Sequence, residues 1–183
     1  MPGWKKKDSR EIASSTIFTM VEDDVLLPDG NTESYTIIDF PDFAAVLPIY
    51  EDKFVFIRNY RYPIDKQVLE IPAGLIDQGE TPEDAAIREL EEETGYILEK
   101  PEKLCTYHPM ASLNTQLAHL YVGHVKKGGD INHDPAEDME TMIIPITEAY
   151  GLLDKGELLH PHTMIALFFA RDRFENILGS NKR

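Results

Sequence analysis

One segment of the chain concentrates the residue types that carry out acid–base and metal chemistry. Ile71 to Tyr96 reads IPAGLIDQGETPEDAAIRELEEETGY and sets a run of carboxylates against a single basic residue, Arg88. Neighbouring carboxylates at helical spacing repel each other by about 0.2–0.5 kcal/mol per pair, so this arrangement does not serve stability. We therefore expect positive charge to bind among them. Carboxylate oxygens are hard ligands of the kind that Mg²⁺ and Mn²⁺ prefer.

Three of these carboxylates are spaced to share one helical surface. Glu92 lies three residues after Glu89, and Glu93 lies four residues after it, so the three side chains project from adjacent parts of one face. Arg88, beside them, is placed to pair with one acid and hold it. The spacing alone also fits a solvated acidic face, and both interpretations stay open at this point.

The elements that must position these acids have clear signals. Thr81 is an N-cap residue followed by proline, and Gly95 suits the left-handed position that ends a helix, which predicts a helix over 82–94. A β-like run, VLEIPA, and a loop at Gly74 precede the helix. A strand, a glycine loop and an acidic helix in this order can bring a backbone carbonyl, such as that of Ala73, close to the acids.

The rest of the chain predicts an α+β protein that begins with strands. Two β-rich runs around Pro28-Asp29-Gly30 predict an N-terminal hairpin, and Phe40-Pro41 gives a boundary after it. The last helix is expected to bury a stripe of Met and aromatic residues that includes Phe168 and Phe169. The remaining predictions are strands over 43–50, 53–62, 115–125 and 141–146 and helices over 147–155 and 161–178.

Charge and cysteine content exclude several classes of function. Eighteen Lys and Arg against 33 Asp and Glu give a formal net charge of -15 over 183 residues, so the overall field repels nucleic acid. Cys105 is the only cysteine, which excludes an internal disulfide and a multi-cysteine zinc site. The N-terminal segment has no apolar region, and no run approaches the roughly 18 apolar residues of a membrane helix. We predict a cytoplasmic protein without a membrane partner.

The segment around Arg88 resembles the Nudix box of Nudix hydrolases, G-x5-E-x7-R-E-U-x-E-E-x-G-U. Every fixed position of that pattern is present. The one departure is Tyr96, where the family usually has an aliphatic residue that packs rather than binds metal. The matching residues are Gly74, Glu80, Arg88, Glu89, Leu90, Glu92, Glu93 and Gly95.

The likeness extends to the subfamily that hydrolyses ADP-ribose and other nucleoside diphosphate sugars. IRNYRYPI and VLEIPAGLIDQGE are similar to its QYR and ElPAG sequences, although HPMASLNTQLAH lacks the glycine of its SPG sequence. The resemblance implies a Nudix α/β/α sandwich with a mixed sheet over 42–183, preceded by a β-hairpin segment over 1–41 that forms a homodimer. It also implies hydrolysis of a pyrophosphate bond to a nucleoside monophosphate and a sugar phosphate.

The resemblance further implies roles for individual residues. The ligands of the divalent ion, Mg²⁺ or alternatively Mn²⁺, are the carbonyl of Ala73 and the side chains of Glu89, Glu92 and Glu93. The catalytic residues are Arg88, Glu92 and a general base from the acidic loop before TMIIPI, either Glu137 or Glu140, ahead of Asp134. The substrate-binding residues are Arg61, on a phosphate, with Glu70, Ser112 and Asn114.

Other hypotheses remain from the sequence. One is a Nudix hydrolase of dinucleoside polyphosphates or modified nucleoside triphosphates, against which PAGLIDQGE and the N-terminal hairpin argue. Another is a non-catalytic Nudix module that senses a nucleotide, although such modules usually lack the glutamates that this chain retains. A simple Ca²⁺ or Mg²⁺ binding loop is disfavoured because DINHDPAEDME lacks the glycine of the EF-hand spacing.

Overall fold

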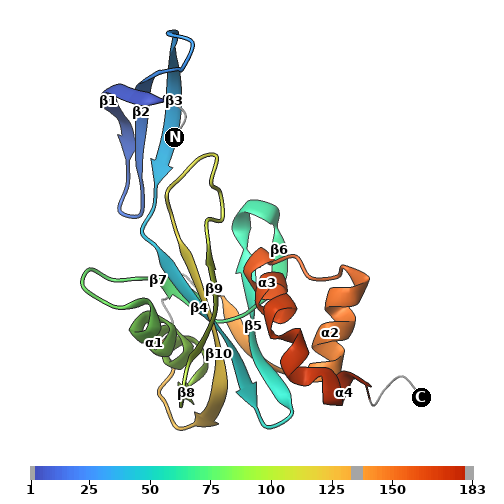
Figure 1. Cartoon of the computed structure of the whole chain (residues 1–183). Helices are drawn as coiled ribbons and strands as arrows, with labels where there is room; N and C mark the ends of the chain where they lie inside the picture. Colours follow the sequence, from blue (N-terminus) through green and yellow to red (C-terminus); the bar gives the residue numbers. More distant parts are fainter. Residues whose placement is uncertain (1–2, 133–137, 180–183) are drawn as a thin grey trace. The chain divides into compact units, whose positions relative to one another are not determined.

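The computed structural model describes residues 3–132 and 138–179. Contacts between Cα atoms divide the chain into two compact units, shown in Figure 1. The first unit comprises Met1–Asp42 and Tyr107–Ala118, and the second comprises Phe43–Thr106 and His119–Arg183. The division into domains 1–41 and 42–183 stays a prediction. The contacts between Cα atoms also place Tyr107–Ala118 in the first unit, which the sequence did not indicate.

The first unit contains an antiparallel sheet in the order β1-β2-β3. The expected hairpin is formed by β2 (Thr19–Leu26) and β3 (Thr32–Asp39). Gly30 has a φ of 89°, a left-handed conformation that a glycine adopts without strain in the connecting turn. Strand β1 (Lys5–Ser14) was not predicted because its sequence KKKDSREIAS is largely polar, and every residue in it is exposed.

The second sheet has the strand order β11-β5-β4-β10-β8, with β6 paired to β5, β7 to β4 and β9 to β10. Its central strands are β4 (Phe43–Tyr50), β5 (Lys53–Arg61) and β10 (Ala118–Lys127), which lie where the apolar runs predicted strands. The shorter strands are β6 (Lys66–Glu70), β7 (Ala73–Leu75), β8 (Tyr96–Leu98), β9 (Glu102–Tyr107) and β11 (Met139–Pro145).

Helices cover both faces of this sheet, as Figure 1 shows for α1 on one side and α2, α3 and α4 on the other. Successive strand residues point to opposite faces. Val55 therefore joins a core with Leu90 of α1 (Pro82–Thr94), whereas Phe54 contacts Tyr150 of α2 and Phe174 on the opposite face. The remaining helices are α2 (Ile146–Lys155), α3 (Pro161–Ala170), η2 (Arg171–Phe174) and α4 (Glu175–Gly179), and a short η1 (Tyr62–Ile64) follows β5. The α+β class predicted from the sequence is confirmed.

The C-terminal helical segment differs from its prediction in two respects. One continuous helix was expected, and the chain forms α3, η2 and α4 in its place. The buried residues of α3 are Thr163, Ala166, Leu167 and Ala170, spaced to form one face. Phe168 and Phe169 lie on the other side and are 69% and 53% exposed, so their assignment to the core was wrong. None of the helices in the described ranges is long and apolar enough to span a membrane.

Tyr96 occupies the position where the resemblance expects an aliphatic residue. Its ring packs in the core under α1, with its centroid 5.2 Å from that of Tyr50. Burial raises the pKa of Tyr96. Within the described part of the chain its buried hydroxyl oxygen has no hydrogen-bond partner, which costs free energy that a phenyl ring would not.

Replacing Tyr96 by Phe is therefore expected to leave the free energy of unfolding unchanged or to raise it by up to about 1 kcal/mol. Tyr150→Phe is the matched comparison, because the Tyr150 hydroxyl donates a 3.0 Å hydrogen bond to the carbonyl of Leu167. That variant should lose about 1 kcal/mol. Urea unfolding curves of both variants measure the difference, and equal losses would contradict an unpartnered Tyr96 hydroxyl.

Candidate active site

Helix α1 begins and ends where the sequence predicts. The Thr81 hydroxyl accepts the backbone N–H of Asp84 at 3.1 Å and donates to the Asp84 carboxylate at 2.7 Å. Gly95 has a φ of 68° and donates its N–H to the carbonyl of Glu91 at 2.8 Å. Each residue of a helix advances about 100° around the axis. Because both ends of α1 are fixed, the direction in which each acidic side chain points is fixed as well.

Arg88 is the centre of the charged cluster on α1. Its Nε and Nη2 each donate to one oxygen of Glu80, both at 2.9 Å. Its Nη1 donates to Glu89 at 2.6 Å and to Glu92 at 3.1 Å, and Nη2 also donates to the carbonyl of Leu75 at 3.1 Å. The sequence predicts one acidic partner for Arg88, and the structure has three.

These contacts shift the ionisation of the cluster toward its charged forms. The hydrogen bonds from Arg88 lower the pKa of Glu80, and the carboxylate of Glu80 in turn raises the pKa of Arg88. Hydrogen bonds between charged groups are stronger than neutral ones, and a two-point pair also fixes the guanidinium plane. Arg88 therefore relieves part of the repulsion among the carboxylates and holds them in place.

The loop before α1 lies directly against this cluster. The backbone N–H of Ala73 donates to a carboxylate oxygen of Glu93 at 3.1 Å. A Cβ added to Gly74 would overlap the carboxylate of Glu89, so a larger residue at this position would require the Glu89 side chain to turn away. The backbone of Ala73 thus contacts Glu93 through its N–H, whereas the prediction that its carbonyl joins the acids stays a prediction.

A second charged pair lies at the ends of β5 and β6. Arg61 donates from Nε to one oxygen of Glu70 at 2.7 Å and from Nη2 to the other oxygen. The side chain of Glu70 is 1% exposed, whereas that of Arg61 is 49% exposed. Arg58, by contrast, pairs with Glu140 at 3.3 Å across β5 and β11, and both of those side chains are exposed.

The sequence predicts that Glu89, Glu92 and Glu93 bind a divalent ion. Among the described residues no three His, Cys, Asp or Glu side chains converge closely enough to hold a metal. Glu89 and Glu92 are bound by Nη1 of Arg88, and Glu93 is bound by the N–H of Ala73. Their oxygens are nevertheless hard donors on adjacent turns of one helix, so their ligand chemistry suits a hard divalent cation, although the side chains of the described residues do not converge on one point.

The other predicted residues lie apart from this cluster in the chain. Glu137 and Asp134 fall outside the described residues. Ser112 and Asn114 belong to the first unit, where the carbonyl of Ser112 accepts a hydrogen bond from the Tyr35 hydroxyl at 2.8 Å. Asn114 is buried, and its side-chain oxygen has no partner among the described residues.

Sequence reasoning missed two residues that lie at Glu70 or at the residue after it, Ile71. The Thr163 hydroxyl accepts the N–H of Ile71 at 3.0 Å, and Nε2 of His160 lies 3.8 Å from Glu70. The only signal was the sequence HPHT at the start of an apolar helix, which has no acidic residue and no evident ligand pattern.

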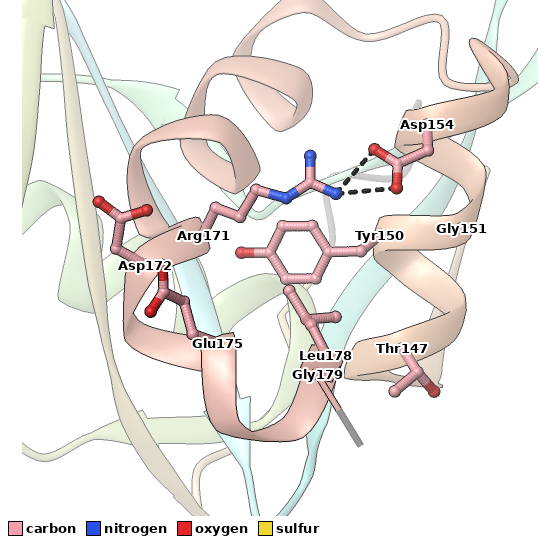
Figure 2. Close-up of a pocket in the computed structure, with 9 residues that line it drawn as sticks. All are labelled: Thr147, Tyr150, Gly151, Asp154, Arg171, Asp172, Glu175, Leu178 and Gly179. Atoms are coloured by element: carbon pink, nitrogen blue, oxygen red, sulfur yellow. Dashed lines mark hydrogen bonds and ion pairs between the residues drawn. The ribbon is translucent and has the colours of Figure 1, made fainter. Parts of the chain in front are cut away.

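A cavity of about 400 Å³ between α2 and the η2–α4 segment is shown in Figure 2. Arg171 enters it, donates to both carboxylate oxygens of Asp154 at 2.8 Å and lies over the ring of Tyr150. None of the predicted site residues lines this cavity. Its one guanidinium is engaged by a carboxylate, so the cavity is not a candidate for the chemistry predicted on α1.

Comparisons with known proteins agree with this arrangement. The model of a family described as NUDIX domain matches residues 40–167. A methanol dehydrogenase activator of Bacillus methanolicus is 35% identical over 87% of this chain and 88% of its own length. An ADP-ribose pyrophosphatase of Bacillus subtilis is 28% identical over 86% of this chain and 86% of its own length.

A solved structure supports the fold. A crystal structure of an ADP compounds hydrolase superposes with a TM-score of 0.83 at 23% sequence identity. The match covers 98% of this chain and 97% of the other. The predicted sandwich fold is therefore confirmed.

Arg88→Gln is expected to lower the free energy of unfolding by about 1–2 kcal/mol, between the values of exposed and buried ion pairs, because three carboxylates lose their guanidinium. Arg173→Gln is the matched control, since it breaks a single exposed pair with Glu102 and should change stability by less than about 1 kcal/mol. Urea unfolding at neutral pH gives both values. Equal effects of the two substitutions would contradict the central place of Arg88.

Wild type and Arg88→Gln also show how the stabilisation by Arg88 depends on pH. Arg88 lowers the pKa of Glu80 from its ordinary value of 4.5, so this pair stabilises the folded state above that pH. Its contribution is lost as the pH falls through the lowered pKa of Glu80. The stability gap between wild type and Arg88→Gln should be full at neutral pH and should narrow in acid. A gap that stays constant down to the acid transition would show that Glu80 is not the main partner.

Proposed function

Because the chain belongs to the Nudix family, we propose that it hydrolyses the pyrophosphate bond of ADP-ribose or another nucleoside diphosphate sugar. The products are a nucleoside monophosphate and a sugar phosphate. The ADP-ribose pyrophosphatase of Bacillus subtilis supports this substrate class. The observation that carries the proposal is the gathering of Glu80, Glu89 and Glu92 by Arg88 beside the loop at Ala73.

The chemistry of the substrate explains why such a cluster is needed. A diphosphate carries concentrated negative charge and resists attack by water, so catalysis depends on neutralising charge and activating a nucleophile. Nudix hydrolases generally need a divalent metal, and we propose Mg²⁺, with Mn²⁺ as the alternative, on Glu89, Glu92, Glu93 and the carbonyl of Ala73. A metal bound there supplies positive charge to the phosphates and lowers the pKa of water.

Arg88 has a separate task in this proposal. It holds Glu80 through Nε and Nη2, whereas it holds Glu89 and Glu92 through Nη1 alone. The two-point pair with Glu80 keeps the guanidinium in place when the other two carboxylates turn to a ligand. Arg88 thus positions the acids of α1 and returns to them when the ligand leaves.

Arg61 is proposed to bind a phosphate of the substrate. Its guanidinium is fixed on one edge by the buried carboxylate of Glu70 and is about half exposed. A guanidinium presents donors along more than one edge, so one carboxylate can fix it while another edge meets an anion. Glu70 therefore acts on the substrate by orienting Arg61, and Ser112 and Asn114 remain proposed substrate contacts.

The general base is proposed to be a carboxylate of the loop that ends at β11. Glu137 and Glu140 are both candidates, and Asp134 comes after them. Glu140 is exposed, and its partner is Arg58 at 3.3 Å. A base must lose such a partner or share it with water before it accepts a proton, because hydrogen bonds to a carboxylate favour its charged form.

Two further parts of the proposal concern the setting of the enzyme. We propose that segment 1–41 mediates a homodimer and that the protein acts in the cytoplasm. Strand β1 lies at one edge of the sheet β1-β2-β3 and is exposed along its whole length, and such an edge is of the kind that a second chain can join.

Hydrolysis is tested with a panel of ADP-ribose, ADP-glucose, GDP-mannose, UDP-glucose and a dinucleoside polyphosphate in the presence of Mg²⁺, with phosphate released by an added phosphatase. One or more sugar nucleotides should be turned over. Glu93→Gln should lower kcat/KM by about 100-fold or more, the usual effect of removing one electrostatic group that stabilises a transition state. Glu83→Gln, an exposed acid in the first turn of α1, is the matched control and should retain activity.

Turnover of the dinucleoside polyphosphate alone would overturn the sugar nucleotide assignment while leaving the Nudix chemistry. No turnover of any compound in the panel would overturn the sugar nucleotide proposal in favour of another Nudix substrate or a sensing module.

The base is identified by Glu137→Gln and Glu140→Gln. The variant that lacks the base should lose about 100-fold or more in kcat with little change in KM, the range expected for general base catalysis. Arg58→Gln is the control for the Glu140 ion pair, because it removes the partner and keeps the carboxylate. Normal kcat in both Glu variants would show that the base lies elsewhere.

A further inference from the structure

The N-terminal end of α3 contacts the strand that carries Glu70. Thr163 is fully buried, and its hydroxyl accepts the backbone N–H of Ile71, the residue after Glu70, at 3.0 Å. The same oxygen lies 2.9 Å from Nδ1 of His160. The N-terminal end of α3 therefore binds the backbone at the end of β6 through the Thr163 hydroxyl, and the imidazole of His160 lies beside that hydroxyl.

His160 connects this hydroxyl to the carboxylate of Glu70. Burial, together with the charge of Arg61, lowers the pKa of His160 to about 4, although Glu70 lies nearby. The ring is thus neutral at pH 7 and carries one N–H. Nε2 faces the carboxylate of Glu70 at 3.8 Å, and a lone pair pointed there would be repelled, so the hydrogen belongs on Nε2.

The tautomer determines the direction of the remaining hydrogen bond. With its hydrogen on Nε2, His160 presents a lone pair at Nδ1, which accepts the hydroxyl hydrogen of Thr163. Thr163 then accepts from Ile71 and donates to His160, while His160 turns its N–H dipole toward Glu70. In this arrangement the Thr163 hydroxyl accepts one hydrogen bond and donates another, and no two donors or two acceptors face each other, which makes the buried arrangement self-consistent.

The orientation of the Glu70 carboxylate determines the orientation of the Arg61 guanidinium. Both carboxylate oxygens of Glu70 bind the guanidinium, so a rotation of the carboxylate would turn the guanidinium with it. Arg61 comes from the last position of β5, where the sheet ends, and its side chain is half exposed. A long side chain at such a place has many rotamers unless a fixed partner selects one.

We propose that Thr163 and His160 are positioning residues that fix Glu70 and thereby aim Arg61 at the phosphate of the substrate. This inference rests on the proposed function, in which Arg61 binds a phosphate. It assigns to the start of α3 a task beyond covering the sheet: this end of the helix sets the affinity for substrate and leaves the hydrolytic step on α1 untouched.

The test compares four variants. Thr163→Val removes the hydroxyl at nearly constant volume, and Thr163→Ser keeps it. His160→Leu removes both ring nitrogens and leaves the bond between Ile71 and Thr163 in place. Thr106→Val is the matched control, because Thr106 forms a similar pair with Nδ1 of His119, at 3.3 Å, on β9 and β10.

Two readouts separate positioning from simple support of the fold. Steady-state kinetics with ADP-ribose give KM and kcat separately, and the NMR signal of the Arg61 Nε–H group, assigned by its loss in Arg61→Lys, reports the bond to Glu70. Thr163→Val and His160→Leu should raise KM about tenfold with kcat changed by about twofold at most, and should shift or broaden the Nε–H signal. Thr163→Ser and Thr106→Val should match the wild type in both.

Wild-type KM together with an unchanged Arg61 signal in Thr163→Val and His160→Leu would overturn the inference, even where thermal unfolding shows that the variants are less stable. A change of kcat alone would also overturn it, since it would place the residues in the hydrolytic step. If the wild type hydrolyses no sugar nucleotide, the proposed function fails, and the Nε–H signal alone decides whether Thr163 and His160 fix Arg61.

Discussion

Repulsion among the carboxylates of α1 is the constraint on which the site depends. A helix that carries Glu89, Glu92 and Glu93 within five residues loses about 0.2–0.5 kcal/mol for each repelling pair unless positive charge lies among them. Arg88 supplies that charge from the helix itself, and its pair with Glu80 ties the helix to the loop that precedes it. The repulsion that remains among these carboxylates favours the binding of a divalent ion, because such an ion relieves more repulsion than one guanidinium.

The loop between β6 and α1 joins the sheet to both helical layers. Three backbone groups in succession are bound from three directions: the N–H of Ile71 by Thr163 of α3, the carbonyl of Pro72 by the N–H of Val46 in β4, and the N–H of Ala73 by Glu93 of α1. Because each contact comes from a different layer, the loop has little freedom to move. This explains how a short loop can hold the Arg61–Glu70 pair and the carboxylate cluster of α1 in fixed relation within the second unit.

Sequence predicted the parts of the site whose signals are local. The bounds of helix α1 were predicted closely, since Thr81 and Gly95 mark its ends, and the spacing of its acids indicated their shared face. The burial of Phe168 and Phe169 was mispredicted because hydrophobic character does not say which side of a helix meets the sheet. Thr163 and His160 were missed because their importance comes from Glu70, about 90 residues earlier in the chain, and no local pattern records such a contact.

We propose that the acids of α1 form a divalent cation site in which the cation competes with Arg88. The most direct measurement is titration of the protein with Mn²⁺, followed by the electron paramagnetic resonance signal of the free ion, in the wild type and in Glu92→Gln. We expect saturable binding of at least one ion per chain, weakened at least about tenfold in the variant. Absence of binding, or binding of equal strength in both proteins, would contradict it.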